Sequence, residues 1–325
     1  MMTAFVLLVS AGCAAPGATT GSSAPQGSAS GGDQLKVAMV CSGPINDGSW
    51  NTEGYNGLEA VKEKFNAEIT YNEQVPIDSL PTVLRTYGRE GYDIVFAHSV
   101  EYDEQMKRIA PEFPDTKFVT INGSSTDTNL YSAQFSYWEL MYFLGMAGAL
   151  MSESNQISMI TAMDTPTHRV ELKAFETGAQ YANPDCVVSA AYTGDWADLT
   201  KAREASLAQI AAGNDVLLAN VSSAASAILG ACQEEGAKGL GWGVDMSPLA
   251  DDTVIVSGLF AMPDLYIGVV ESILSETDDR VLKLSMRDNY MSMGEMADWV
   301  PEEVAQAVSQ RVEEFMNGDF EIEGL

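Results

Sequence analysis

The 325-residue chain carries 46 Asp and Glu against 17 Lys and Arg, which gives a net charge of −29 at pH 7. A surface this acidic repels phosphate backbones and anionic lipid headgroups, so we expect no nucleic acid among its partners. The length is sufficient for two domains with a large core.

The N-terminus has the pattern of a bacterial lipoprotein signal. A short apolar run at 5–9 leads into three small residues directly before Cys13. Residues 14–34 consist largely of Ala, Gly, Ser, Thr and Pro, a composition that does not form a core. We therefore expect 1–13 to be a signal peptide with Cys13 as the lipidation site, 14–34 to be a flexible tether, and the protein to be lipid-anchored on the extracytoplasmic face of the cell membrane. The alternative is a buried strand whose cysteine packs as a small hydrophobic residue.

From residue 36 onward, short apolar runs typical of buried strands alternate with segments that have apolar residues at helical spacing. This alternation predicts an α/β fold with parallel sheets covered on both faces. The number of units exceeds what one doubly wound sheet usually holds, so we expect two lobes. The predicted strands are 36–41, 68–75, 93–98, 117–121, 156–161, 187–192, 215–220, 239–244 and 253–259, and helices are predicted at 52–65, 101–113, 137–151, 168–181, 199–212 and 223–235.

The patterns that catalysis or metal binding requires are missing. The chain has two histidines, His98 and His168, and no His-x-x-x-His or Cys-x-x-Cys pair. It also lacks the Gly-x-Ser-x-Gly nucleophile motif and the Gly-x-x-x-x-Gly-Lys phosphate-binding loop. We therefore expect a protein that is not an enzyme and that has no metal site and no cofactor. Cys41, Cys186 and Cys232 are predicted to be buried thiols.

Polar residues gather at the predicted carboxyl ends of strands, where open α/β sheets bind ligands. Asn46, Asp47 and Asn51 follow the first strand, His98 ends the third, and Asp245 ends the strand in "GWGVD". The two lobes would present these ends to each other across one cleft. This arrangement predicts a clamp that closes over a ligand.

Two tryptophans stand among these polar turns, Trp50 in "DGSWN" and Trp196 in "TGDWA", one in each predicted lobe. Most tryptophans fill cores, but the polar neighbours on both sides argue against that role here. Two flat rings on opposite walls predict a sandwich around a planar heterocycle, with stacking worth about 1–3 kcal/mol for each ring.

The neighbouring polar residues admit two interpretations each. Asn46, Asp47 and Asn51 match the donors and acceptors of a purine edge, or they serve as turn and helix-cap residues. Asp245 can accept hydrogen bonds from vicinal ribose hydroxyls, or it caps a turn. His98 either donates to a ligand or satisfies a loop carbonyl.

Several stretches together resemble the basic membrane protein (BMP, PnrA-like) family, the substrate-binding lipoproteins of ABC importers. The match runs in order from about residue 36 to 270. The resemblance implies a type I periplasmic-binding-protein fold, a lipid anchor, a purine nucleoside as the common ligand, and a permease with its ATPase as partners. The stretches are "KVAMVCSGPINDGSWNTEGYNGL", "GYDIVFAHSVEY", "FPDTKFVTING", "YTGDWADLTKAREASLAQIAAGNDVLLA" and "GWGVD".

The family's binding motifs match this chain unevenly. Its Asn-Asp-x-Ser-aromatic-Asn turn matches 46–51, and its Tyr-Thr-Gly-x-aromatic turn matches 192–196, with Trp in both where many members have Phe. Its Gly-Val-Asp, which faces the ribose, matches 243–245. The departure is Cys41-Ser42, where many nucleoside-binding members place an Asp. This departure leaves a nucleobase, a flavin-like ring or a sugar as alternative ligands.

We expect residues 35–135 with 256–287 to form the N-terminal lobe and 136–255 with 288–325 to form the C-terminal lobe, joined by hinge crossovers. The expected function is that of a monomeric binding protein that delivers a purine nucleoside or similar planar heterocycle to an ABC permease. A membrane-tethered ligand sensor of the same fold is the alternative.

Overall fold

The structure is a computed structural model that describes residues 34–275 and 279–322. The predicted signal peptide with Cys13, and the tether up to residue 33, lie outside the described residues. Within those residues, no helix combines the length and the apolar character needed to cross a bilayer.

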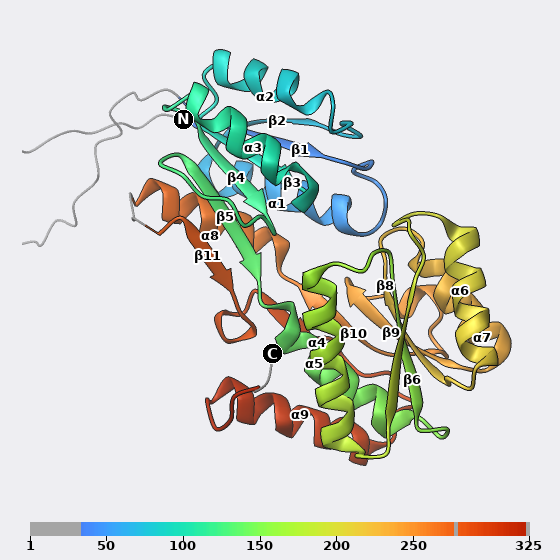
Figure 1. Cartoon of the computed structure of the whole chain (residues 1–325). Coiled ribbons are helices and arrows are strands. Elements are labelled where there is room, and N and C mark those ends of the chain that lie inside the picture. The colour runs from blue at the N-terminus through green and yellow to red at the C-terminus, as the bar shows by residue number, and fades with distance from the viewer. Residues whose placement is uncertain (1–33, 276–278, 323–325) are drawn as a thin grey trace, which may run out of the picture. The chain divides into compact units, whose positions relative to one another are not determined.

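The first sheet has six strands in the order β11-β5-β4-β3-β1-β2, all paired in parallel. Alternate residues of strand β1, which lies between β3 and β2, face opposite cores. Val37, Met39 and Cys41 belong to the core that includes residues of α1 and α8, whereas Ala38 and Val40 belong to the core that includes residues of α2 and α3. Helices α1 and α8 cover one face of the sheet, and α2 and α3 cover the other (Figure 1). The elements are β1 (Lys36–Cys41), α1 (Trp50–Phe65), β2 (Glu68–Asn72), α2 (Leu80–Arg89), β3 (Ile94–His98), α3 (Asp103–Ile109), β4 (Lys117–Ile121), β5 (Leu130–Phe135), α8 (Met262–Leu274) and β11 (Val281–Leu284).

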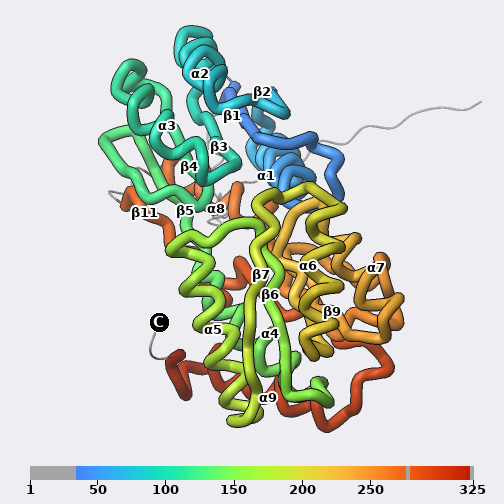
Figure 2. The backbone as a smooth tube through the Cα atoms, turned by 45° about the vertical axis from the view of Figure 1, so that its right-hand side comes forward, coloured from blue at the N-terminus to red at the C-terminus, as the bar shows by residue number. Residues whose placement is uncertain are grey.

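The second sheet also has six strands, in the order β12-β10-β9-β8-β6-β7, and only the short edge strand β12 runs antiparallel to its neighbour. Helices α4, α5 and α9 pack together on one face, and α6 and α7 cover the other (Figure 2). The elements are α4 (Tyr137–Met151), β6 (Gln156–Thr161), α5 (Pro166–Ala182), β7 (Val187–Tyr192), α6 (Leu199–Ala211), β8 (Val216–Asn220), α7 (Ala225–Glu235), β9 (Lys238–Gly243), β10 (Val254–Phe260), β12 (Met291–Met293) and α9 (Glu302–Met316).

The predicted α/β architecture of doubly wound parallel sheets is confirmed. The chain passes between the sheets after β5, after β10 and after β11. Strand β10 pairs with β9 as far as Leu259, so the expected boundary at 255/256 falls inside a strand of the second sheet, and the change of sheet comes after Phe260. An apolar run predicts a strand, but it does not reveal which sheet the strand joins.

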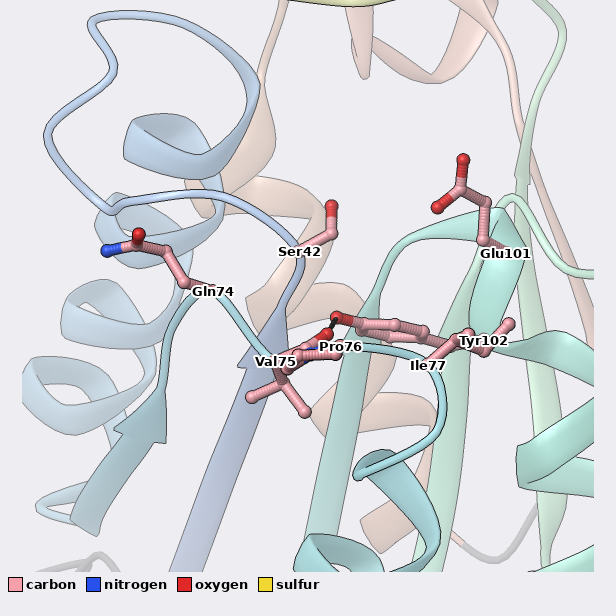
Figure 3. A pocket seen from close by; sticks show the side chains of 7 residues that line it. All are labelled: Ser42, Gln74, Val75, Pro76, Ile77, Glu101 and Tyr102. Atoms are coloured by element: carbon pink, nitrogen blue, oxygen red, sulfur yellow. Dashed lines mark hydrogen bonds between the residues drawn. The ribbon is translucent and has the colours of Figure 1, made fainter.

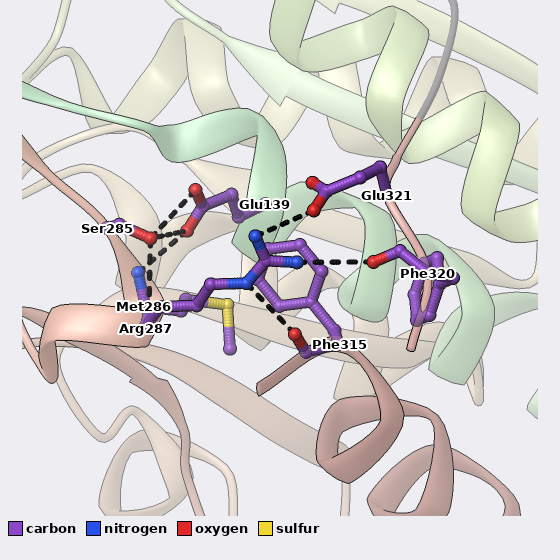
Figure 4. A network of polar contacts seen from close by, with 7 residues as sticks. All are labelled: Glu139, Ser285, Met286, Arg287, Phe315, Phe320 and Glu321. Atoms are coloured by element: carbon purple, nitrogen blue, oxygen red, sulfur yellow. Dashed lines mark hydrogen bonds and ion pairs between the residues drawn. The ribbon is translucent and has the colours of Figure 1, made fainter. Parts of the chain in front are cut away.

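The crossing after β11 is fastened to the helices of the second sheet (Figure 4). The Ser285 hydroxyl donates to the buried carboxylate of Glu139 in α4 at 2.9 Å, and the Met286 N–H donates to the same group at 2.7 Å. Arg287 donates to the carbonyl oxygens of Phe315 at 2.9 Å and of Phe320 at 3.2 Å. From Ser285 onward this segment is therefore bound to α4 and to the end of α9.

Candidate ligand-binding site

Asp47 fixes the turn that leads into α1. Its Oδ1 accepts hydrogen bonds from the backbone N–H groups of Ser49 at 2.9 Å and Thr52 at 3.0 Å, and its Oδ2 accepts from the side-chain amide of Asn51 at 2.8 Å. Burial raises the pKa of Asp47, but these hydrogen bonds outweigh burial and hold the pKa below its ordinary value. Both carboxylate oxygens thus cap the N-terminus of α1 in this structure.

Asn51 and His98 are buried, and both hold this turn in place. Asn51 accepts a hydrogen bond from the Gly43 N–H at 3.3 Å, which ties the end of β1 to α1. The His98 ring lies under the Trp50 ring, with centroids 4.3 Å apart and planes 22° apart. The Trp50 indole N–H donates to the His98 carbonyl oxygen at 3.1 Å, so the indole is fixed at the carboxyl end of β3.

The hydrogen bonds of His98 define its tautomer. Its Nε2 lies 2.8 Å from the Trp50 carbonyl oxygen, which can only accept, so Nε2 carries the proton. Burial lowers the pKa of His98 to about 4, and the ring is therefore neutral at pH 7. Its Nδ1 then accepts from the Tyr266 hydroxyl at 2.9 Å. Both ring nitrogens are occupied by protein groups in this structure.

Aromatic side chains from both sheets meet at Phe260, the last residue of β10. Its ring lies 6.4 Å from that of Trp50 and 5.1 Å from that of Trp242, at 87° in both cases. Phe135 and Tyr137, at the crossing after β5, lie 5.2 and 5.1 Å from the same ring. These five side chains form what we call the aromatic cluster, and it continues from Trp50 to the carboxyl end of β9.

The remaining predicted site residues lie in other turns. Trp196 follows β7, where its ring lies 5.5 Å from the ring of His168. Asp245 follows β9, is exposed, and accepts from the Ser247 N–H at 3.0 Å. Asn46 is exposed in the turn before α1. The structure thus brings Asp47, Trp50, Asn51 and His98 together, whereas Trp196 and Asp245 lie at the carboxyl ends of second-sheet strands.

A buried acid near these strand ends escaped the sequence analysis. Glu171 of α5 is 3% exposed, and its Oε2 accepts from the Asn220 side-chain amide at 2.9 Å. Burial raises its pKa to about 8, so the carboxyl group is largely protonated at pH 7. Asn220 is paired in register with Thr161, whose buried hydroxyl has no partner among the described residues. A largely protonated carboxyl group, an amide and a hydroxyl therefore lie at the carboxyl ends of β6 and β8.

The described residues contain no cluster of His, Cys, Asp and Glu that could hold a metal ion. Cys41, Cys186 and Cys232 are free and buried, which confirms the prediction of buried thiols. Burial raises the pKa of the Cys41 thiol to about 12, so it is not a reactive thiolate at neutral pH.

Two doubly wound sheets, linked by crossings and bearing polar and aromatic turns at their carboxyl ends, are typical of the two-lobed class to which solute-binding proteins belong. The family model described as "ABC transporter substrate-binding protein PnrA-like" (Bmp) matches residues 34–325. The chain belongs to this family, as the sequence predicted. Its members are solute-binding proteins rather than enzymes, act outside the cytoplasm, and serve a permease with its ATPase.

Individual relatives carry different names. The transcriptional activator protein med of Bacillus subtilis is 30% identical over 223 residues, covering 68% of this chain and 69% of that protein. A purine-binding protein of Brucella abortus is 26% identical over 255 residues, covering 77% and 72%. A solved solute-binding protein of an ABC transporter system from Aeropyrum pernix K1 has a TM-score of 0.78 at 16% identity, covering 89% of this chain and 93% of that one. This likeness confirms the predicted type I periplasmic-binding-protein fold.

Proposed function

We propose that this protein is a monomeric, lipid-anchored ABC-importer component that binds an uncharged planar heterocycle, a purine nucleoside or a close analogue, and delivers it to the permease. The observation that carries the proposal is the fixed position of the Trp50 ring. Its ring is held by the His98 ring below it and by its own N–H hydrogen bond at the carboxyl ends of β1 and β3. A ring fixed in this way loses little entropy when a ligand stacks on it.

The charges around Trp50 favour an uncharged ligand. None of the site residues described above is Lys or Arg, and Glu171 is largely neutral at pH 7. Nothing in this set would offset the charge of a phosphate. A relative named for purine binding adds support for a nitrogen heterocycle.

In the proposed mechanism, Trp50 stacks on the ligand while Asp47, Asn51 and His98 hold its turn, and Asn46 reaches the ring edge. Trp196 and Asp245 belong to the second lobe and would join the ligand as the lobes close by hinge motion. Closure is driven only by the higher affinity of the closed state for the ligand. The closed form would then dock on the permease.

Calorimetric titration of inosine, hypoxanthine, riboflavin and glucose into the purified protein tests the ligand class. We expect heat of binding with the planar compounds and none with glucose. Binding of glucose alone would reject the planar-ligand proposal. Conversion of inosine at catalytic protein concentrations would reject a pure binding role.

The role of Asp245 can be tested with a nucleoside and its base. If its carboxylate accepts ribose hydroxyls, Asp245→Ala should weaken inosine binding by about 1.5–3 kcal/mol and leave hypoxanthine binding unchanged. Asp252→Ala, which changes another acid of the same lobe, serves as the control. Equal losses for nucleoside and base would show that Asp245 does not contact the sugar.

A second candidate, a membrane-tethered sensor, is favoured by the similarity to a protein named as a transcriptional activator. Both roles use ligand-driven closure, so binding assays do not separate them. Uptake of labelled inosine by cells that lack the gene separates the two roles. Lost uptake supports import, whereas normal uptake with altered transcription supports sensing.

Metabolic labelling with a radioactive fatty acid, compared with Cys13→Ser, tests the proposed anchor.

A further inference from the structure

We infer that the permease docks on the first lobe at the loops after β2 and β3, through an extracytoplasmic loop that carries Lys or Arg beside an apolar residue. The inference rests on the proposed function. It names the surface that the permease contacts and the chemistry that this surface requires of the permease. The surface consists of four exposed residues, Ile77, Asp78, Val100 and Glu101, and we call it the acidic rim.

The charges of the first lobe are separated between the two ends of its sheet. Because the strands run parallel, their carboxyl ends lie together, and the helices that follow them begin at that end. Lys36 and Lys117 begin β1 and β4, and α1, α2 and α3 each carry Lys or Arg in the last turn, so these bases lie at the opposite end. The loops after β1, β2, β3 and β4 contain no Lys or Arg, at 42–49, 73–79, 99–102 and 122–129. The end that bears the acidic rim therefore attracts cationic groups.

Helix dipoles account for part of this separation, because acids stabilise the first turn of a helix and bases stabilise the last. They do not account for the acidic rim. Asp78 precedes α2, and Glu101 lies in the three-residue 3₁₀ helix Val100–Tyr102, which is too short to have a substantial dipole. The loops, rather than the needs of a helix, place these two carboxylates in solvent.

Large apolar side chains stand exposed beside these carboxylates. Val100 is 55% exposed and Ile77 is 46% exposed. A cavity of about 390 Å³ opens next to them, with Ile77 and Glu101 among the residues that line it (Figure 3). Val75, Pro76 and Tyr102 give this cavity an apolar lining. Exposed apolar side chains bordered by charged groups are typical of a surface that binds another protein.

The backbone of this surface is firmly held. The Tyr102 hydroxyl donates to the Val75 carbonyl oxygen at 2.5 Å, and the Val75 N–H donates to the Cys41 carbonyl oxygen at 3.1 Å. The Glu101 N–H donates to the Ser99 hydroxyl at 3.3 Å. These bonds join the loops after β2 and β3 to the sheet, so docking orders little of the backbone and loses little entropy.

The side chain of Lys or Arg has both properties that the cavity requires. Its methylene groups can lie against Pro76 and Tyr102 while its charged end pairs with Glu101. An apolar neighbour on the same permease loop would cover Ile77 and Val100. An acidic loop would be repelled by this surface and by the net charge of −29, so the rim selects a basic partner.

Uptake of labelled inosine tests the docking surface, in cells that lack the gene and carry the full-length protein or a variant. We expect Glu101→Lys to lower uptake at least ~10-fold, because it places like charges together, and Ile77→Ser to lower uptake about threefold. Calorimetry on the purified variants should show unchanged inosine affinity. The matched controls lie at the opposite end of the lobe: Glu90→Lys at an exposed acid after α2, and Leu274→Ser at a leucine that is 52% exposed. Neither control should change uptake.

Normal uptake with both Glu101→Lys and Ile77→Ser would overturn the docking surface and leave the proposed function intact. A loss of inosine affinity that matches the loss of uptake would also overturn it, because the cavity would then hold the ligand. An equal loss with Glu90→Lys would show a general effect of charge and would likewise count against the rim. If the unaltered protein did not bind inosine, the proposed function itself would fall, and the inference with it. Immunoblotting and circular dichroism confirm that each variant is present and folded.

Discussion

Replacing Glu171 with glutamine should stabilise the protein progressively as the pH rises from about 4.5 to about 8.5. In the folded protein burial raises the pKa of this carboxyl group from its ordinary 4.5 to about 8. Between these values the folded state keeps a proton that the unfolded state releases, so unfolding becomes easier as the pH increases. Glutamine keeps the shape and can still accept from Asn220, but it has no proton to lose.

The measurement is the free energy of unfolding by urea across this pH range. Relative to the unaltered protein, Glu171→Gln should gain about 2–4 kcal/mol between the two ends of the range, and the gain should level off above the folded pKa. Glu204→Gln, an exposed acid in α6, should show no such trend. Parallel stability curves for the unaltered protein and Glu171→Gln would show that Glu171 is not held protonated.

The second large effect is expected at Gly54, which lies in α1 directly against His98. A Cβ added at this position would meet ring atoms of His98 at 2.6–2.8 Å. His98 cannot yield easily, because both of its ring nitrogens are bonded and the ring stacks under Trp50. We expect Gly54→Ala to destabilise the protein by about 1–3 kcal/mol and to shift the tryptophan fluorescence, since the indole rests on the displaced ring.

Gly230→Ala in α7 is the matched control, because a Cβ there meets nothing within 4 Å. This substitution should be neutral or stabilise by up to ~1 kcal/mol through helix propensity. Chemical denaturation of both variants separates the steric effect of the added Cβ from its effect on helix propensity. If Gly54→Ala were as stable as Gly230→Ala, the close support of Trp50 by His98 would be wrong.

Local sequence patterns predicted most of the fold, and the strands they missed have a physical reason. Strand β5 has polar Ser132 and Gln134 in alternation with apolar residues, a strand-like pattern, but it lies in a stretch interpreted as the boundary between lobes. β11 and β12 are four and three residues long. Segments this short form strands only because they pair with β5 and β10, which lie far away in the sequence.

The candidate site was predictable where a turn has an unusual composition, and not elsewhere. Trp50 was identified because a large indole interrupts a small, polar turn. Trp242 and Phe260 escaped notice because apolar residues inside strands normally fill cores. Glu171 escaped because an acid in an amphipathic helix normally faces water, and only the packing of α5 places it in the interior. The pairing of His98 with Tyr266 joins residues 168 positions apart and has no local signal.

The account depends most on Trp50 as the surface on which a planar ligand stacks. Calorimetric titration of inosine into the unaltered protein, Trp50→Ala and Trp299→Ala tests it directly. Trp299 is a matched control, because its half-buried indole also donates to a backbone carbonyl, that of Asp251, at 3.1 Å, while its ring lies against Lys238 at the start of β9. We expect Trp50→Ala to lose about 1–3 kcal/mol of binding free energy and Trp299→Ala to lose none. Equal affinity in all three proteins would contradict the account.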